Sequence, residues 1–476
     1  MASLSKIMRS NLPVVGAMIL AFAASSAAQI CDAVPKQILL DLVNQGDLPA
    51  VATQYGLEQT PIDQVGTPPT YRMRIRDEIT RTPCEIAADM QLDTRIRQRE
   101  TNRKLKVVEK EGLPWTLGRS WAIGRSWAIG GSTKGYNKQW FPDTIRLDQA
   151  HQITRGYMQT PPPGQQPRPI VIAVLDTGID LNHPVFAGKL VPGYDFVDND
   201  SDPSEVGILR QDPTYGHGTH VAGIVALVAP EAKIMPIRVL DRNGESDLWK
   251  LKDALIWAAT HGADVVNMSF AYPREVAPQS NEFIKDLLHG CAGVPLLPGE
   301  QQFPEFQGEV IIAVAGAGNG GQIGNGAAKT YPAAERSLQD DNILSVGSSS
   351  RFDRLSVFST MADSPEENRD RWVRTVAPGE EIVSAIPGGR FGMWSGTSMA
   401  APIVSGITAL LLSVRPINLP TRQATDVVEE LEETGYGWDC RVASRNIWME
   451  TSRVDAFCSV MNNQACFPND RTICTE

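Results

Sequence analysis

Four nearly continuous apolar runs mark the middle of the chain, and each stops at or next to Gly, Asp, Asn or Ser: PIVIAVLD (169–176), AKIMPIRVL (232–240), ADVVNMSF (263–270) and EVIIAVAGAGN (309–319). Such runs are typical of strands buried on both faces of a parallel sheet. Apolar residues recur at helical spacing over residues 219–229, 246–262 and 398–414. The alternation predicts an α/β fold, a three-layer sandwich with a mostly parallel central sheet, and functional residues at the carboxyl ends of its strands.

Residues 32–113 follow a different pattern. Residues 35–57 and 84–100 have helical spacing, whereas residues 70–77 alternate like a strand. This predicts a small α+β unit with two helices on a sheet. The hexapeptide in GRSWAIGRSWAIGG (118–131) then occurs twice in tandem. Two copies are too few to build a repeat fold, so we interpret residues 114–139 as a Gly-rich connector.

The amino terminus has the pattern of a secretory signal peptide. Lys6 and Arg9 precede the uncharged segment LPVVGAMILAFAA, and Ser26 and Ala28 stand before a predicted cut near Gln29. A retained membrane anchor is the alternative, but the apolar core is short for a spanning helix. We therefore predict that residues 1–28 are removed and that the protein is secreted or periplasmic, without membrane contact after cleavage.

Composition and charge narrow the function classes. The 476 residues are 42% hydrophobic and 21% charged, which is typical of a globular protein. A net charge of −11 argues against nucleic acid and anionic membranes as partners. We expect a monomer with no organic cofactor.

Seven cysteines suit an oxidising compartment. Cys31 and Cys84 share the amino-terminal unit, Cys291 stands alone, and four lie in the tail: Cys440, Cys458, Cys466 and Cys474. Disulfides are the first interpretation, although the pairing cannot be deduced. A four-thiolate zinc site in the tail is the rival, but the intervening 17, 7 and 7 residues provide no C-x₂-C knuckle.

Three residues combine into a candidate catalytic group. Asp176 ends an apolar run, His217 opens a helix behind Gly216, and Ser398 stands at the start of a long apolar helix. A serine nucleophile needs an adjacent base and a carboxylate that orients the base. A zinc site at His217 and His220 is disfavoured, because the spacing is three and no glutamate lies between them.

Three segments together resemble the active-site motifs of subtilisin-like serine peptidases: VLDTGID, GHGTHVAG and SGTSMAAP. The resemblance extends from about Trp140 to Ala456. It implies a catalytic domain over 140–435, followed by a Cys-rich segment over 436–476 that includes the last catalytic-domain helix. It also implies that Ser398 attacks the peptide carbonyl, His217 takes the proton and Asp176 orients His217. Asn319 in VAGAGNGG matches the asparagine of the family's oxyanion hole.

The resemblance also suggests where polypeptide substrates bind. They would add as a strand against residues 242–246 and 269–271, with Gly244, Ser269, Phe270 and Ala271 as contact residues. Here the sequence departs from the family, because SFAY (269–272) replaces the usual glycines after the serine. Side-chain preference is therefore left open.

Two further features follow from the same resemblance. The segment YDFVDNDSDPSE (194–205) is similar to a calcium loop of thermitase-like members, with Asp195, Asp198, Asp200 and Asp202 as candidate ligands; a solvated acidic turn is the alternative. By its position, the unit over 29–113 fits the family's ferredoxin-like propeptide, an inhibitor and folding aid. An unrelated accessory domain is the alternative.

Function is therefore predicted as that of an exported, self-processing serine endopeptidase. The rival hypothesis is a catalytically silent module that uses the same sheet to bind peptides. A sedolisin-type peptidase is excluded, because that group has glutamate where GHGTH has histidine.

Overall fold

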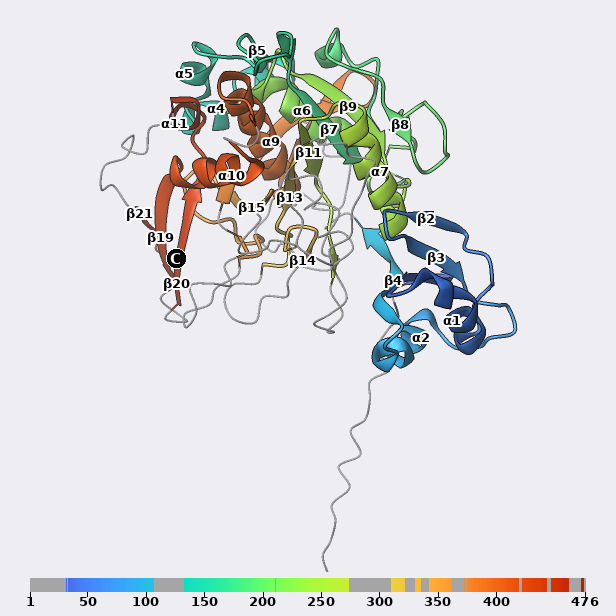
Figure 1. Cartoon of the computed structure of the whole chain (residues 1–476). Helices are drawn as coiled ribbons and strands as arrows, with labels where there is room; N and C mark the ends of the chain where they lie inside the picture. Colours follow the sequence, from blue (N-terminus) through green and yellow to red (C-terminus); the bar gives the residue numbers. More distant parts are fainter. Residues whose placement is uncertain are drawn as a thin grey trace, which may run out of the picture.

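The computed structural model describes residues 31, 33–106, 132–209, 211–273, 310–321, 330–334, 342–361, 372–373, 375–418, 422–442, 447–461 and 472–474. The predicted signal peptide, the tandem GRSWAI repeat and Cys291 lie outside these residues. Figure 1 shows a smaller amino-terminal unit, in blue, beside a larger one.

The amino-terminal unit is an antiparallel sheet with two α-helices. Its strands are β1 (Ala33–Leu42), β2 (Asp63–Val65), β3 (Thr70–Arg74) and β4 (Ile96–Lys106), and its helices are α1 (Leu48–Tyr55) and α2 (Pro83–Asp89). A disulfide joins Cys31 to Cys84 in α2. The predicted α+β architecture is confirmed, but the helical prediction was wrong over Pro35–Leu42 and Ile96–Glu100, which are strands.

The strand β1 explains this difference. Ile38, Leu40 and Leu42 face the unit's own core, whereas Leu39 packs into the core of the larger unit. Because both faces of β1 are buried, its sequence does not alternate between apolar and polar residues. A short apolar run of this kind cannot be distinguished from a helix by periodicity.

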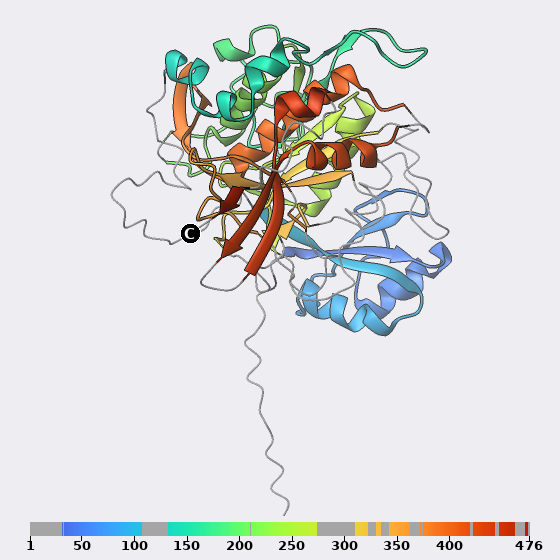
Figure 2. The same cartoon turned by 90° about the vertical axis from the view of Figure 1, so that its left-hand side faces the viewer.

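The two units share a sheet. β10 (Glu245–Asp247) of the larger unit pairs antiparallel with Lys104–Lys106 of β4. Both views show the blue unit against one side of the larger unit (Figures 1 and 2). Beside this pairing, Trp249 of α7 (Leu248–Thr260) is 1% exposed, and its indole Nε1 donates to Asp63 Oδ2 at 2.9 Å. The amino-terminal unit is therefore docked through backbone and side-chain contacts.

The larger unit is built on a ten-stranded sheet. Adjacent strands are parallel from β8 to β20, in the order β8 (Tyr194–Asp195), β9 (Lys233–Arg238), β7 (Val171–Asp176), β11 (Val265–Met268), β13 (Ile312–Gly316), β15 (Ile343–Ser349), β16 (Thr375–Pro378) and β20 (Ile447–Arg453). β19 (Tyr436–Val442) is antiparallel to β20, and β21 (Thr472–Cys474) is parallel to β19. The four apolar runs of the sequence supply β7, β9, β11 and β13.

Helices cover both faces of this sheet. On one face, a core joins α6 (His217–Val228), α9 (Thr397–Val414), α10 (Ala424–Glu433) and α11 (Ala456–Met461). On the other face, a second core contains the apolar side of α7. The predicted three-layer α/β sandwich is confirmed. α9 is long and apolar enough to cross a membrane, but 94% of its residues are buried inside the protein.

Short elements complete the described part. The end of the predicted connector forms α3 (Thr133–Asn137), which α4 (Phe141–Thr144) and α5 (Leu147–His151) follow. Two-stranded sheets pair β5 (Tyr157–Met158) with β6 (Arg168–Pro169), β12 (Tyr272–Pro273) with β14 (Thr330–Tyr331), and β17 (Ile382–Ile386) with β18 (Arg390–Trp394). In the tail, Cys458 is buried and disulfide-bonded.

Candidate active site

Asp176 and His217 come together where β7 ends and α6 begins. The Nδ1 atom of His217 lies 2.7 Å from Asp176 Oδ1, and both side chains are buried. The same carboxylate oxygen accepts the N–H of Thr177 at 2.8 Å. A Cβ atom on Gly218 would stand 2.2 Å from the Gly178 carbonyl oxygen, so only glycine lets α6 approach this turn so closely. The sequence thus fixes the position of the histidine through the glycines around it.

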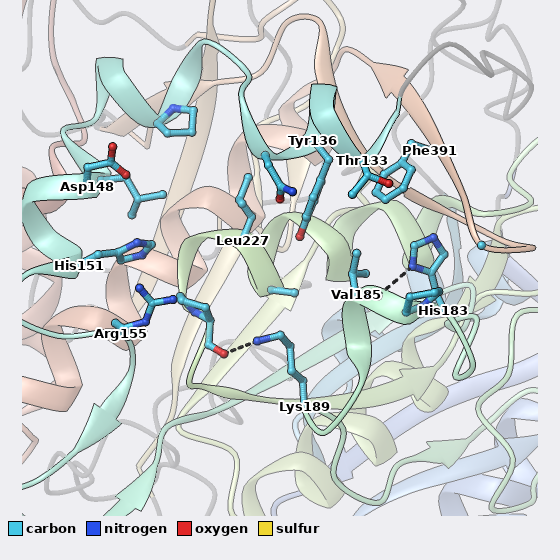
Figure 3. Close-up of a pocket in the computed structure, with 17 residues that line it drawn as sticks. Thr133, Tyr136, Asp148, His151, Arg155, His183, Val185, Lys189, Leu227 and Phe391 are labelled. Carbon is cyan, nitrogen blue, oxygen red and sulfur yellow. Dashed lines mark hydrogen bonds between the residues drawn. The ribbon is translucent and has the colours of Figure 1, made fainter.

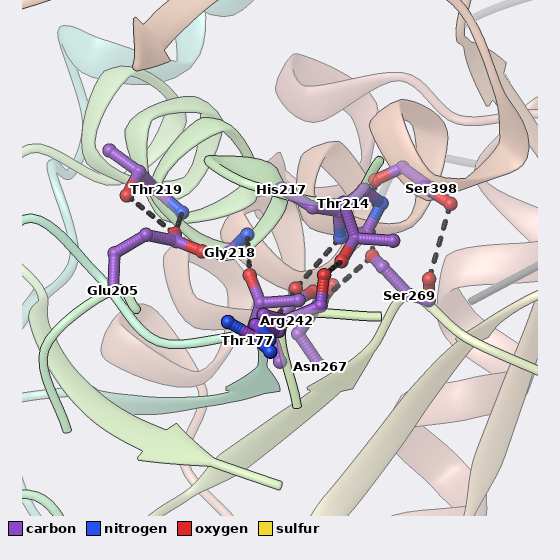
Figure 4. A network of polar contacts seen from close by, with 11 residues as sticks. Thr177, Glu205, Thr214, His217, Gly218, Thr219, Arg242, Asn267, Ser269 and Ser398 are labelled. Atoms are coloured by element: carbon purple, nitrogen blue, oxygen red, sulfur yellow. Dashed lines mark hydrogen bonds and ion pairs between the residues drawn. The ribbon is translucent and has the colours of Figure 1, made fainter. Parts of the chain in front are cut away.

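Ser398 lies in the first turn of α9. Its hydroxyl donates to the carbonyl oxygen of Ser269 at 3.2 Å, and Ser269 Oγ donates to the carbonyl oxygen of Ser398 at 3.0 Å (Figure 4). The second bond replaces one that the helix lacks. Pro402 has no N–H to donate to the carbonyl four residues earlier, which is that of Ser398. Ser269 therefore provides the missing donor.

Pro402 is the sixth residue of α9 and lies inside the helix. The supporting network continues inward. Asn267 Nδ2 donates to Ser269 Oγ at 3.0 Å, and Ser405 Oγ donates to Asn267 Oδ1 at 2.9 Å. Asn267 and Ser405 could not be identified from the sequence, since each is an ordinary core position when it is viewed alone.

Asn319 follows β13 and contacts the turn that carries Ser398. Its Oδ1 atom accepts the N–H of Thr397 at 2.9 Å and the Thr397 hydroxyl at 3.1 Å. These bonds fix the orientation of the amide. Its Nδ2 atom lies 3.3 Å from the place where a Cβ atom on Gly396 would stand. The backbone nitrogen of Ser398 lies 3.6 Å from the same point, so the two nitrogen atoms are neighbours.

His220 is a buried neighbour of the pair. Its Nε2 atom lies 3.3 Å from the Gly392 carbonyl oxygen, and its ring stacks on Trp394 with the centroids 4.5 Å apart. Burial, followed by the charge of His217, lowers the pKa of His220 to about 3. A neutral ring in this setting is a packing element. Within the described ranges, no three His, Cys, Asp or Glu side chains are gathered as a metal site.

Part of the predicted substrate edge, residues 245 and 246, is already paired. Gly244, with φ +74°, ends the turn before β10, and β10 pairs with β4 of the amino-terminal unit. Ser269, Phe270 and Ala271 are buried at 1%, 0% and 6% exposure. Ser269 contacts Ser398 directly, whereas Phe270 belongs to the core that contains the apolar side of α7.

The acidic loop does not fit a calcium site in this arrangement. Arg238 Nη1 lies 2.6 Å from Asp195 Oδ2 and 2.5 Å from Asp198 Oδ2. Asp200 Oδ1 accepts the N–H of Asp202 at 2.8 Å, and Asp202 Oδ1 accepts the Ser204 hydroxyl at 2.5 Å. The guanidinium of Arg238 therefore supplies the positive charge that an ion would bring, and the remaining carboxylates stabilise the loop's own turns.

A cavity of about 530 Å³ lies elsewhere, between α3, α5 and the end of α6 (Figure 3). Its cationic side chains already have partners. Lys189 Nζ donates to the Pro230 carbonyl, and Arg155 pairs with Glu231 at 3.3 Å. None of Asp176, His217, Asn319 and Ser398 lines it. This cavity is separate from the candidate active site.

Comparison with known proteins agrees with the geometry. The model of the subtilase family matches residues 168–435. A thermophilic serine proteinase of Bacillus sp. (strain AK1) is 36% identical over 314 residues, which are 63% of this chain and 64% of that protein. The chain thus spans just under two thirds of that relative. Thermitase of Thermoactinomyces vulgaris is 31% identical over 335 residues, which are 68% of this chain and 96% of thermitase.

The solved structures include a similar fold. The crystal structure of fervidolysin from Fervidobacterium pennivorans, described as a keratinolytic enzyme related to subtilisin, gives a TM-score of 0.61 at 20% identity. The match covers 91% of this chain and 62% of fervidolysin. At this identity, the likeness concerns the fold.

Proposed function

Because the chain belongs to the subtilase family, we propose that it is a serine endopeptidase that hydrolyses polypeptides with Ser398, His217 and Asp176. The observation that carries this proposal is the buried bond of 2.7 Å between Asp176 Oδ1 and His217 Nδ1, with Ser398 on the first turn of the adjacent helix. A carboxylate on Nδ1 holds the imidazole in the tautomer whose Nε2 atom can accept a proton.

In the proposed reaction, Ser398 Oγ attacks the peptide carbonyl carbon while its proton passes to His217 Nε2. The carbonyl oxygen then carries the negative charge of the tetrahedral intermediate. Asn319 Nδ2 and the N–H of Ser398 donate to that oxygen. His217 next gives the proton to the leaving amine, and water repeats the sequence on the acyl-enzyme. Every step uses groups of this chain, and calcium has no part in it.

The amino-terminal unit acts in this proposal as a propeptide that blocks its own enzyme. Its support is the pairing of Lys104–Lys106 with Glu245–Asp247, the edge on which substrate would add as a strand. Export and self-processing complete the proposal, supported by the signal-like amino terminus and by the disulfide between Cys31 and Cys84.

Labelling with a fluorophosphonate tests the catalytic assignment, because the reagent reacts only with an activated serine. We expect the native chain to be labelled once the amino-terminal unit has been removed, and Ser398→Ala to remain unlabelled. Ser395→Ala is the matched control and should be labelled like the native chain, since Ser395 Oγ accepts the Glu381 N–H and has no proposed role in the reaction. A folded native chain that binds peptides but takes no label would instead be a silent binding module.

A further inference from the structure

The carboxyl group of Glu205 is buried next to the candidate catalytic pair. The proposed reaction does not use this carboxyl group. Its Oε2 atom accepts the Thr219 hydroxyl at 2.9 Å and the Thr219 N–H at 3.3 Å (Figure 4). The Oε1 atom is buried as well. Burial raises the pKa of Glu205 to about 7, although hydrogen bonding to Thr177 and Gly216 opposes this shift.

The position of Thr219 gives this contact a specific meaning. α6 begins at His217 behind Gly216, a glycine with φ +92° that offers no side-chain cap. Thr219 is the third residue of the helix, and the N–H at that position is the one that a capping side chain usually satisfies. Glu205, fourteen residues earlier, thus takes the place of the missing cap. Its carboxyl group also lies at the positive end of the helix dipole.

The same glutamate belongs to a segment that packs against the turn after Asp176. Glu205 donates its N–H to the Ile179 carbonyl at 3.1 Å, and Ile179 donates to the Pro203 carbonyl at 3.1 Å. A Cβ atom on Gly178 would stand 2.6 Å from the Ser204 carbonyl oxygen. The segment 203–205 therefore contacts the turn behind Asp176 through its backbone and the helix of His217 through its side chain.

We propose that Glu205 is a positioning residue for the Asp176–His217 pair. By capping α6 from outside the helix, it fixes the position of His217 relative to Asp176. This inference rests on the proposed serine-peptidase function. A glutamate that only stabilised the fold would affect the melting temperature and the fraction of active molecules. A positioning residue also changes the turnover of each active molecule, since a small displacement of His217 slows proton transfer.

The test measures kcat and KM on a chromogenic peptide anilide with mature enzyme, with active molecules counted by fluorophosphonate titration. We expect Glu205→Ala to lower kcat per titrated site about tenfold with KM within about twofold. Glu205→Gln should recover most of kcat, because the amide oxygen can still accept the Thr219 N–H. The matched control is Glu231→Ala, an exposed glutamate beyond the far end of α6 that pairs with Arg155; its kcat should equal that of the native enzyme.

If Glu205→Ala does not accumulate, Glu205→Met takes its place, because methionine keeps the length and lacks the acceptor. An unchanged kcat per titrated site in either variant would overturn the proposal, and so would a glutamine variant as slow as the alanine variant. The proposed function fails separately, through a native enzyme that neither takes the label nor turns over the anilide.

Discussion

In the proposed reaction, the amide of Asn319 serves a charge that exists only during catalysis. Two bonds from Thr397 hold its oxygen, and its Nδ2 atom lies near the same point beside Gly396 as the backbone nitrogen of Ser398. Such a donor stabilises the transition state more than bound substrate.

We therefore expect Asn319→Ala to lower kcat by about two to three orders of magnitude with little change in KM. Steady-state kinetics on a peptide anilide would measure this effect. Asn182→Ala, at an exposed asparagine of the 180–183 turn, is the control and should behave like the native enzyme. An unaltered kcat in Asn319→Ala would remove this residue from the oxyanion hole.

A buried carboxyl group in β1 makes the stability of the amino-terminal unit depend on pH. Burial raises the pKa of Asp41 from 3.8 to about 6, against the opposing charge of Arg97. A raised pKa means that the folded state binds the proton more tightly. The stabilisation is therefore complete below about pH 4, declines as the pH rises through 6, and is lost above it.

Asp41→Asn should remove this dependence and make the unit more stable at pH 7, by on the order of 1–2 kcal/mol. Hydrogen exchange of β1 amides in the uncut Ser398→Ala chain, at pH 5 and pH 7.5, would measure it. Equal protection of the β1 amides at both pH values in the chain that keeps Asp41 would contradict this prediction. It would show that the carboxyl group titrates as an exposed one does.

At the scale of elements, α9 depends on a hydrogen bond from outside itself. Ser269→Ala removes the donor that serves the Ser398 carbonyl in place of Pro402. We expect a loss of about 1–3 kcal/mol in the free energy of unfolding, together with a lower kcat. Ser413→Ala, at a buried serine near the other end of α9, should lower stability alone. Chemical denaturation and kinetics on both variants distinguish the two effects. If Ser269→Ala had the same kcat as Ser413→Ala, the first turn of α9 would keep its position without Ser269.

The loop of Asp195 and Asp198 depends in a similar way on Arg238 in β9. Because the guanidinium already pairs with both carboxylates, calcium or a chelator should leave the melting temperature of the native chain unchanged. Arg238→Met should lower it, since two carboxylates then face each other without a cation, and calcium should restore part of the loss. Scanning calorimetry with and without calcium checks both statements. A native chain stabilised by calcium would reinstate the metal site that the sequence predicted.

Elements also show what a sequence can and cannot reveal. β7, β9, β11 and β13 were predictable because strands buried on both faces leave uninterrupted apolar runs. Asp176, His217, Ser398 and Asn319 were predicted as site residues through motifs, and that assignment stays a prediction. Glu205 was not, since its contact with Thr219 exists only after the intervening loop has folded back. Arg238 was missed for the same reason, because a strand arginine gives no local sign that it will pair with two loop aspartates.

At the scale of the whole molecule, the amino-terminal unit and the catalytic unit are joined where β4 pairs antiparallel with β10. We infer that the segment following β4 reaches the candidate active site of its own chain at a very high effective concentration. We expect Ser398→Ala to accumulate as an uncut precursor, because alanine removes the nucleophile and remains a good helix former. The native chain should be cut between Glu111 and Gln139.

Mass spectrometry of both chains from a host without other peptidases would locate the cut. Addition of active native enzyme to the Ser398→Ala precursor is the control and should shorten it. Normal maturation of Ser398→Ala alone would assign the cut to another enzyme and leave the amino-terminal unit as an accessory domain.

Trp249 is 1% exposed and contacts the amino-terminal unit twice: its indole Nε1 donates to Asp63 Oδ2, and its backbone N–H donates to Asn102 Oδ1. Arg72 and Lys252 lie over its ring at 5.0 Å and 3.7 Å from the centroid. An indole that passes from such surroundings into water emits light of longer wavelength. Departure of the amino-terminal unit would therefore be visible in the protein's own fluorescence, and its rate could be followed in real time without an attached dye.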